Sequence, residues 1–226
     1  GRQLDGRASR MLRQSIEEKG INIITEANTE ALIGQDGHVN QVRLKDGTVL
    51  DADLVVFAVG IRPNIALAQS AGLRCNRGIL VNDTMQTFDP SIYAVGECIE
   101  HRNQTFGLVE PLWGQAFICA THLAEHGSLT FKSPTVPTQL KVSGVDVFSA
   151  GNFEPKEDYE DIILNDEKRQ IYKRIIIQKD KVIGAVLFGD TEDGMWYAEL
   201  IADQTPISTF RNKLLFGKDF AMKKAG

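Results

Sequence analysis

The chain has 226 residues, of which 42% are hydrophobic and 24% are charged, a balance typical of a globular protein with a buried core. A formal net charge of -5 gives no overall attraction to nucleic acid or anionic membranes, so we expect neither as a partner. The longest apolar run has about eight residues, far fewer than the ~20 of a membrane helix. Without a signal-peptide core, and with three widely spaced cysteines, we expect a cytoplasmic protein.

The first sixty residues predict a helix, a strand and an antiparallel meander. Apolar residues at helical spacing predict the helix over 8–19, and a short strand follows over 21–25. The meander consists of strands 39–44 and 48–50 with hairpin turns at Asp36-Gly37 and Asp46-Gly47. The continuously apolar, valine-rich run Leu54–Val59 then predicts a strand buried on both faces.

The next segment predicts a first ligand site. A short helix over 65–71 and a strand over 79–81 are followed by a buried strand over 92–95. That last strand ends at Gly96-Glu97, which places a carboxylate at the carboxyl end of a strand, where open α/β sheets bind their ligands. Glu97 is therefore a candidate site residue.

A second candidate site is the start of a helix predicted over 115–126, which Pro111, Leu112 and Trp113 precede. The same helix contains an H-x-x-E-H pattern whose histidines, His122 and His126, have a spacing suited to zinc. Gly127 ends the helix at once and no compelling third ligand follows, so we expect these histidines to be ordinary residues of a last helical turn.

The remainder predicts a small α+β domain behind a polar linker at 132–137. Short strands alternate with polar turns, at 140–142, 145–148, 161–164, 171–178 and 182–188. Thr191 and Asp193 are placed to cap a final helix. The basic residues of the last sixteen positions predict a solvated linker.

The absent motifs limit what the chain does alone. It has no G-x-G-x-x-G, no P-loop and no G-x-S-x-G. A dinucleotide pyrophosphate therefore has no glycine-rich cradle here, and a self-contained hydrolase is not indicated.

Two segments carry a family resemblance. The run ending Ala58-Val59-Gly60-Ile61-Arg62-Pro63-Asn64, and the stretch from Gly78-Ile-Leu-Val to Tyr93-Ala-Val-Gly-Glu97-Cys98, resemble two motifs of the two-dinucleotide-binding flavoprotein reductases. Within that family, Phe106-Gly-Leu-Val, Lys141-Val-Ser-Gly-Val-Asp-Val and Gly184-Ala-Val-Leu-Phe-Gly-Asp-Thr are similar to the large subunits of assimilatory NAD(P)H nitrite reductases. The resemblance implies an α/β fold, partly of the two-dinucleotide-binding type, followed by an α+β domain.

The resemblance also implies cofactor contacts. In the family an aspartate accepts a hydrogen bond from the ribityl chain of FAD, and Glu97 stands in its place. Pro111 to Gln115 would approach the flavin ring, where backbone N–H groups stabilise negative charge. The implied cofactor-binding residues are Gly60, Gly96, Glu97, Pro111, Leu112, Trp113 and Gln115. No residue of this chain is implied to be catalytic or to bind a metal.

By the same resemblance the chain is part of a longer subunit, and its partners are the rest of that subunit and a possible second copy in a homodimer. Residues 1–60 would be the second half of the NAD(P)H domain, 61–133 the returning part of the FAD domain and 134–226 a C-terminal domain. Iron–sulfur and sirohaem centres would lie outside the chain. We expect it to be inactive alone, because both glycine-rich loops are missing.

Two alternatives stay open. One is a rubredoxin or ferredoxin reductase of the same superfamily. The other is a non-catalytic module in which the domain after Pro137 mediates dimerisation or docking of a redox partner. The sequence does not discriminate NADH from NADPH, because the selecting residue would lie in the missing region.

Overall fold

The structure, a computed structural model, describes residues 3–125, 127, 129–133, 137–142, 144–154 and 157–223. It forms two compact units: residues 24–133 make one, and residues 1–23 together with 134–226 make the other. The predicted division at 60 and 133 into three domains stays a prediction. Among the described residues, no helix combines the length and hydropathy that crossing a membrane requires.

The unit of residues 24–133 begins with the predicted meander. Three antiparallel strands pair in chain order, β1 (Thr29–Gln35), β2 (His38–Leu44) and β3 (Val49–Asp51). The two Asp-Gly turns join them as expected, with Gly37 and Gly47 at φ of 81° and 90°. The strand predicted over 21–25 does not form, and β1 takes its place in the sheet.

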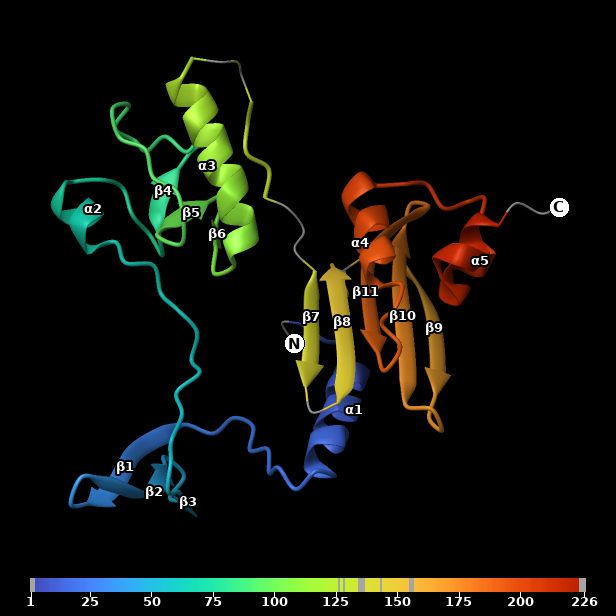
Figure 1. Cartoon of the computed structure of the whole chain (residues 1–226), viewed down its shortest axis with the longest axis horizontal. Coiled ribbons are helices and arrows are strands. Elements are labelled where there is room, and N and C mark those ends of the chain that lie inside the picture. Colours follow the sequence, from blue (N-terminus) through green and yellow to red (C-terminus); the bar gives the residue numbers. More distant parts are fainter. Residues whose placement is uncertain are drawn as a thin grey trace. The chain divides into compact units, whose positions relative to one another are not determined.

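The apolar run Leu54–Val59 is not a strand, which corrects the sequence prediction. It is extended backbone without a pairing partner among the described residues, and Figure 1 draws it as the long connection after β3. Its side chains are largely uncovered, with Val56 76% and Val59 87% exposed. An apolar run this exposed lacks the neighbours that a doubly buried strand requires.

A second small sheet and a long helix complete this unit. Helix α2 (Ala66–Ser70) precedes a parallel pair, β4 (Ile79–Val81) and β5 (Ile99–His101), and β6 (Gln104–Thr105) adds antiparallel to β5. Helix α3 (Val109–Leu123) packs on them around one apolar core, formed by Met85, Ile99, Phe106, Ile118, Cys119 and Phe131.

Two predictions in this region are wrong in detail. Residues 92–95 form no strand, and only Tyr93 bridges to Gln86. Helix α3 begins six residues earlier than predicted, at Val109. Pro111 permits this start, because it occupies the third helical position, where an N–H has no partner within the helix.

The other unit contains a five-stranded antiparallel sheet, as predicted. Its spatial order is β7-β8-β11-β10-β9. The strands are β7 (Thr138–Val142), β8 (Val145–Gly151), β9 (Glu160–Asp166), β10 (Ile171–Gln178) and β11 (Lys181–Phe188). We call it the C-terminal sheet.

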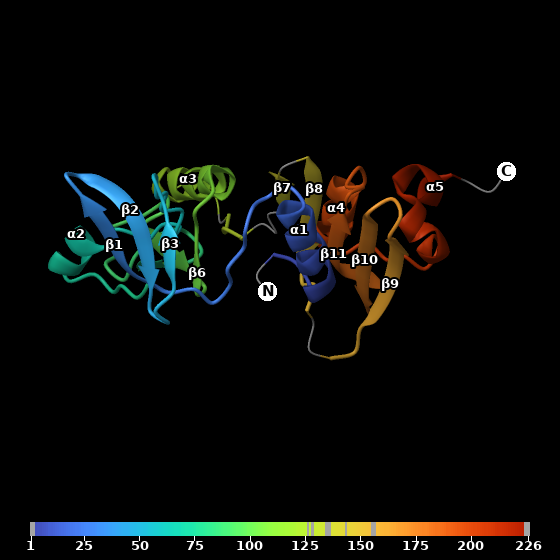
Figure 2. The same cartoon turned by 90° about the horizontal axis from the view of Figure 1, so that it is seen from below.

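Both faces of the C-terminal sheet are covered by helices. Alternate residues of β11 separate the two sides: Ala185 and Leu187 pack with helix α4 (Gly194–Asp203), whereas Val186 and Phe188 pack with Leu4 and helix α1 (Gly6–Glu17). Both views show α1 against this sheet (Figures 1 and 2). Asp193 is the N-cap of α4, as predicted, but its carboxylate accepts from the N–H of Lys218 instead of from the helix.

The basic C-terminal segment is not a solvated linker over its described part. It forms a short 3₁₀ helix, η1 (Arg211–Phe216), and helix α5 (Lys218–Met222). Leu214 is fully buried and Ala221 nearly so, both in the α4 core, and the hydroxyl of Tyr197 donates to the carbonyl of Leu214 at 2.6 Å. Charge alone misled the prediction, because the apolar residues between the basic ones carry the packing. Lys224 lies outside the described residues.

Candidate functional site

The turn Gly96–Cys98 is the centre of the candidate site. Gly96 adopts a φ of 101°, which a residue with a Cβ rarely adopts. The N–H of Ile99 donates to the carbonyl of Gly96 at 3.4 Å, and β5 starts there. The chain therefore reverses tightly at Gly96, and the reversal presents residue 97 at the surface.

Gln115 of α3 holds this turn in place. Its side chain is completely buried, and its Oε1 accepts a hydrogen bond from the N–H of Gly96 at 2.8 Å. Its Nε2 is buried and has no hydrogen-bond partner within the described part of the chain. A buried donor without an acceptor destabilises a fold, which is a reason to look for a ligand at such an atom.

Glu97 is exposed, and among the described residues its carboxylate forms no hydrogen bond or ion pair. The carboxylate is therefore free to accept hydrogen bonds from a ligand. The fixed turn orients the backbone beneath it, whereas the side chain itself keeps its rotamer freedom.

The N-terminal turns of α3 lie beside this turn, because Gln115 belongs to them. The first helix N–H groups without intrahelical partners are those of Leu108, Val109 and Glu110, since Leu112 is the first residue positioned to donate back along the helix. The resemblance placed these N–H groups at Pro111 to Gln115. The free ones lie just before that segment, at Leu108 to Glu110. Of the residues predicted here, Trp113 is 73% exposed, Pro111 is buried and Leu112 is partly buried against the core of this unit.

Gly60 is followed by Ile61, which lies next to the residues that precede α3. Gly60 has a φ of 78°, and a Cβ built on Gly107 would lie 3.3 Å from Cδ1 of Ile61. Gly107 directly precedes the N-cap residue of α3, Leu108. The structure therefore brings three predicted features, the end of the apolar run, the Gly96 turn and the α3 terminus, to one side of this unit.

A polar cluster beneath β5 was not predicted from sequence. Asp83 accepts from Arg102 at 2.6 and 3.0 Å and lies 2.8 Å from Nε2 of buried His101. The Arg102 hydrogen bonds, and then the bond with His101, lower the pKa of Asp83 to about 2. A cavity of about 270 Å³ adjoins the cluster, lined by His101, Arg102, Gln104, Phe131, Lys132 and Ser133.

Glu100 shows how such buried charge is held. Its side chain is fully buried, and it accepts from Asn76 Nδ2, Arg77 N and Gly78 N at 3.1, 2.8 and 3.2 Å. Burial alone would raise its pKa, but these hydrogen bonds outweigh burial and lower it. No sequence motif marks Asp83, His101 or Glu100, because their partners lie about twenty residues away in the chain.

The described residues give no support for a zinc site at the H-x-x-E-H pattern. His122 Nδ1 lies 2.8 Å from the hydroxyl of Tyr93 instead of facing a metal, and no group of three metal-ligating side chains forms within the described ranges. His126 lies outside them.

Comparison with known proteins places the chain in a family. Residues 1–116 match the pyridine nucleotide-disulphide oxidoreductase family, and residues 137–205 match the rubredoxin NAD+ reductase C-terminal domain. The chain therefore belongs to the pyridine nucleotide-disulphide oxidoreductase family, and the predicted fold class and family are confirmed.

Individual proteins of known name are similar to most of this chain. The chain is 47% identical to a nitrite reductase [NAD(P)H] of Bacillus subtilis over 92% of its own length and 26% of that protein. It is 39% identical to the assimilatory nitrate reductase electron transfer subunit of the same organism, over 95% and 28%. The solved structure of an NAD-dependent persulfide reductase from A. fulgidus superposes with a TM-score of 0.78 at 26% identity, over 93% of this chain and 43% of that one. The chain thus spans about a quarter of the curated relatives' length.

Proposed function

We propose that this chain is the electron-input part of an NAD(P)H-dependent flavoprotein of the nitrite reductase type. The observation that carries the proposal is the Gly96–Glu97 turn, fixed by buried Gln115 and presenting a free carboxylate at the surface. Several relatives that match most of the chain are named nitrite reductases, which supports this kind of flavoprotein.

The residues present fit FAD. The orphaned Nε2 of Gln115, the free carboxylate of Glu97 and the uncapped start of α3 together offer donors and an acceptor on one side of the unit. Glu97 would accept from ribityl hydroxyls, Trp113 would lie near the ring, and the N–H groups of Leu108 to Glu110 would stabilise negative charge there. When bound, FAD accepts hydride from NAD(P)H and passes electrons on.

Uncovered apolar surface supports a longer functional protein. Besides residues 54–61, one side of α3 is open, with Trp113 73%, Phe117 63% and Leu123 59% exposed. We propose that the remaining parts of the NAD(P)H and FAD domains cover both surfaces, which would make residues 1–60 and 61–133 halves of larger domains. Exposed apolar patches of this kind mark protein contacts.

The electron acceptor defines a second candidate. In a nitrite reductase, iron–sulfur and sirohaem centres elsewhere in the protein would receive the electrons. A rubredoxin or ferredoxin reductase is favoured instead by one observation, the match of residues 137–205 to the rubredoxin NAD+ reductase C-terminal domain. Nitrite-dependent oxidation of NAD(P)H by the longer native protein discriminates between the two.

Variants of Glu97 in the longer native protein test the flavin site. We expect Glu97→Ala to lose FAD on desalting, whereas Glu97→Asp, which installs the carboxylate that the family uses, retains it. Glu26→Ala, an exposed acid on a loop of the same unit, is the matched control. Full flavin retention in Glu97→Ala, measured by visible absorbance, contradicts the assignment.

A further inference from the structure

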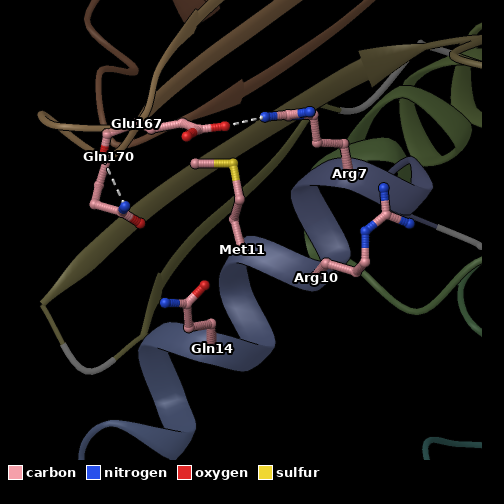
Figure 3. A pocket seen from close by; sticks show the side chains of 6 residues that line it. All are labelled: Arg7, Arg10, Met11, Gln14, Glu167 and Gln170. Carbon is pink, nitrogen blue, oxygen red and sulfur yellow. Dashed lines mark hydrogen bonds and ion pairs between the residues drawn. The ribbon is translucent and has the colours of Figure 1, made fainter.

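Helix α1 covers one face of the C-terminal sheet. Leu4 is 7% and Ala8 0% exposed, and both pack against side chains of three strands, Val147 of β8, Tyr172 of β10, and Val186 and Phe188 of β11. Met11 and Leu12, one turn on, extend the contact. Figure 3 shows Met11 directed from α1 toward the β9–β10 turn that carries Glu167 and Gln170.

A buried carboxylate lies at the centre of this contact. Asp5 is 5% exposed and uses both of its oxygens. Oδ1 accepts from the N–H of Ala8 at 2.9 Å and so caps the helix. Oδ2 accepts from the hydroxyl of Tyr172 at 2.8 Å and from Nη1 of Arg174 at 3.2 Å. One side chain therefore joins the start of α1 to β10.

The strand side of the contact is itself held in place. Arg174 donates from Nη1 to the carbonyl of Phe153 at 3.1 Å and from Nη2 to Asp161 of β9 at 2.9 Å. Tyr172 is 2% exposed, and burial followed by the bond to Asp5 raises its pKa. Nε of Arg174 is buried and has no hydrogen-bond partner within the described part of the chain. Removing one partner of a buried ion pair is strongly destabilising, because it leaves the other charge uncompensated.

Ion pairs at the rim contribute much less. Arg7 of α1 pairs with Glu167 at 3.0 Å across a cavity of about 440 Å³, but both side chains are exposed (Figure 3). Exposed pairs of this kind add little to stability. Asp5 is therefore the residue that dominates the polar part of the interface.

The two sides of the interface belong to different matched domains. Helix α1 lies within residues 1–116, and β8, β10 and β11 lie within residues 137–205. We propose that Asp5 anchors α1, an element of the pyridine-nucleotide part of the chain, to the C-terminal sheet. The inference rests on the proposed function only in assigning α1 to the NAD(P)H domain.

The anchored helix limits which face of the C-terminal sheet can bind another protein. The side of its sheet that carries Tyr172, Val186 and Phe188 is covered by α1 of the same chain. That side is then not open for dimerisation or for docking of a redox partner, which was one alternative left open by the sequence.

Hydrogen exchange of the 226-residue chain tests the anchor through Asp5→Asn. Asparagine is as good an N-cap as aspartate, so the variant keeps the cap but loses the charge that Arg174 binds. We expect the amides of α1 to exchange about 10- to 100-fold faster, because hydrogen bonds to charged groups are the stronger ones and a helix this short is marginal when undocked. The amides of strands β1–β3 should exchange at the wild-type rate.

Asp46→Asn is the matched control. Asp46 also accepts a backbone N–H, that of Thr48 at 2.9 Å, but in an exposed turn of the other unit, so α1 should exchange at the wild-type rate. An α1 that exchanges at the wild-type rate in Asp5→Asn overturns the proposal.

If Asp5→Asn does not fold, Tyr172→Phe removes only the hydroxyl, and α1 should exchange about tenfold faster. Exchange at the wild-type rate in that variant overturns the proposal equally. Neither readout involves flavin, so a negative result leaves the proposed function standing.

Discussion

At the residue scale, Gln115 shows what a resemblance conveys and what it omits. The family pattern implied that Gln115 touches the cofactor, but its complete burial and its bond to Gly96 make it a support for the turn as well. A sequence gives no sign of this, because the hydrogen bond joins residues nineteen positions apart. That Gln115 also binds the cofactor stays a prediction.

Asp83 gives a prediction for the acid side of stability. Its pKa is lowered in the folded state from 3.8 to about 2, so its contribution to the free energy of unfolding is complete above pH 3.8 and is lost as pH falls toward 2. The gap in stability between wild type and Asp83→Asn should therefore be constant near neutral pH and shrink between about pH 4 and 2. Urea unfolding followed through amide NMR signals of β5 measures it.

Asp53→Asn is the control for this measurement, since Asp53 has no hydrogen bond or ion pair among the described residues. Its stability should run parallel to wild type across the same pH range. A gap for Asp83→Asn that stays constant down to pH 2 would mean that the pairing with Arg102 does not hold in solution.

At the scale of elements, local signals predicted local structure. Asp-Gly turns predicted the hairpins of β1 to β3, and the alternation of short strand-like stretches with polar turns located the strands of the C-terminal sheet. Both signals depend on neighbouring residues only. Leu54–Val59 has equally strong strand composition but forms no strand. A central strand requires partners on both sides, and propensity cannot replace them.

The exposure of residues 54–61 leads to a prediction for a charged substitution there. Val59 is 87% exposed, so Val59→Lys should change the free energy of unfolding of the 226-residue chain by no more than about 0.5 kcal/mol. In the longer native protein the same change would place a charge in a covered strand and should destabilise it by several kcal/mol, with loss of FAD. Thermal unfolding and flavin absorbance of both proteins measure the contrast.

Ile163→Lys is the matched control, since Ile163 is 51% exposed on β9 and belongs to the other unit. It should be tolerated in both proteins. Equal tolerance of Val59→Lys in the longer protein would show that residues 54–61 stay uncovered there.

At the scale of the whole molecule, the sequence predicted the family and fold class correctly, but not how its parts assemble. The resemblance assigned helix α1 to the nucleotide domain, and that assignment stays a prediction. Nothing in the sequence indicates that α1 packs on the C-terminal sheet, because this packing depends on Asp5 meeting Tyr172, 167 residues away. The basic tail was misread for the same reason, since burial of Leu214 depends on a distant core. Long-range contacts are what one sequence conveys least.

The central claim is that this chain contributes to a flavin site that is completed by further protein. The most direct test is the visible spectrum of the longer native protein after incubation with FAD and desalting, before and after anaerobic addition of NADH or NADPH, beside the 226-residue chain treated alike. We predict flavin bands that either nucleotide bleaches in the longer protein, and a colourless 226-residue chain. A longer protein that retains no flavin, or whose flavin neither nucleotide bleaches, would contradict the account.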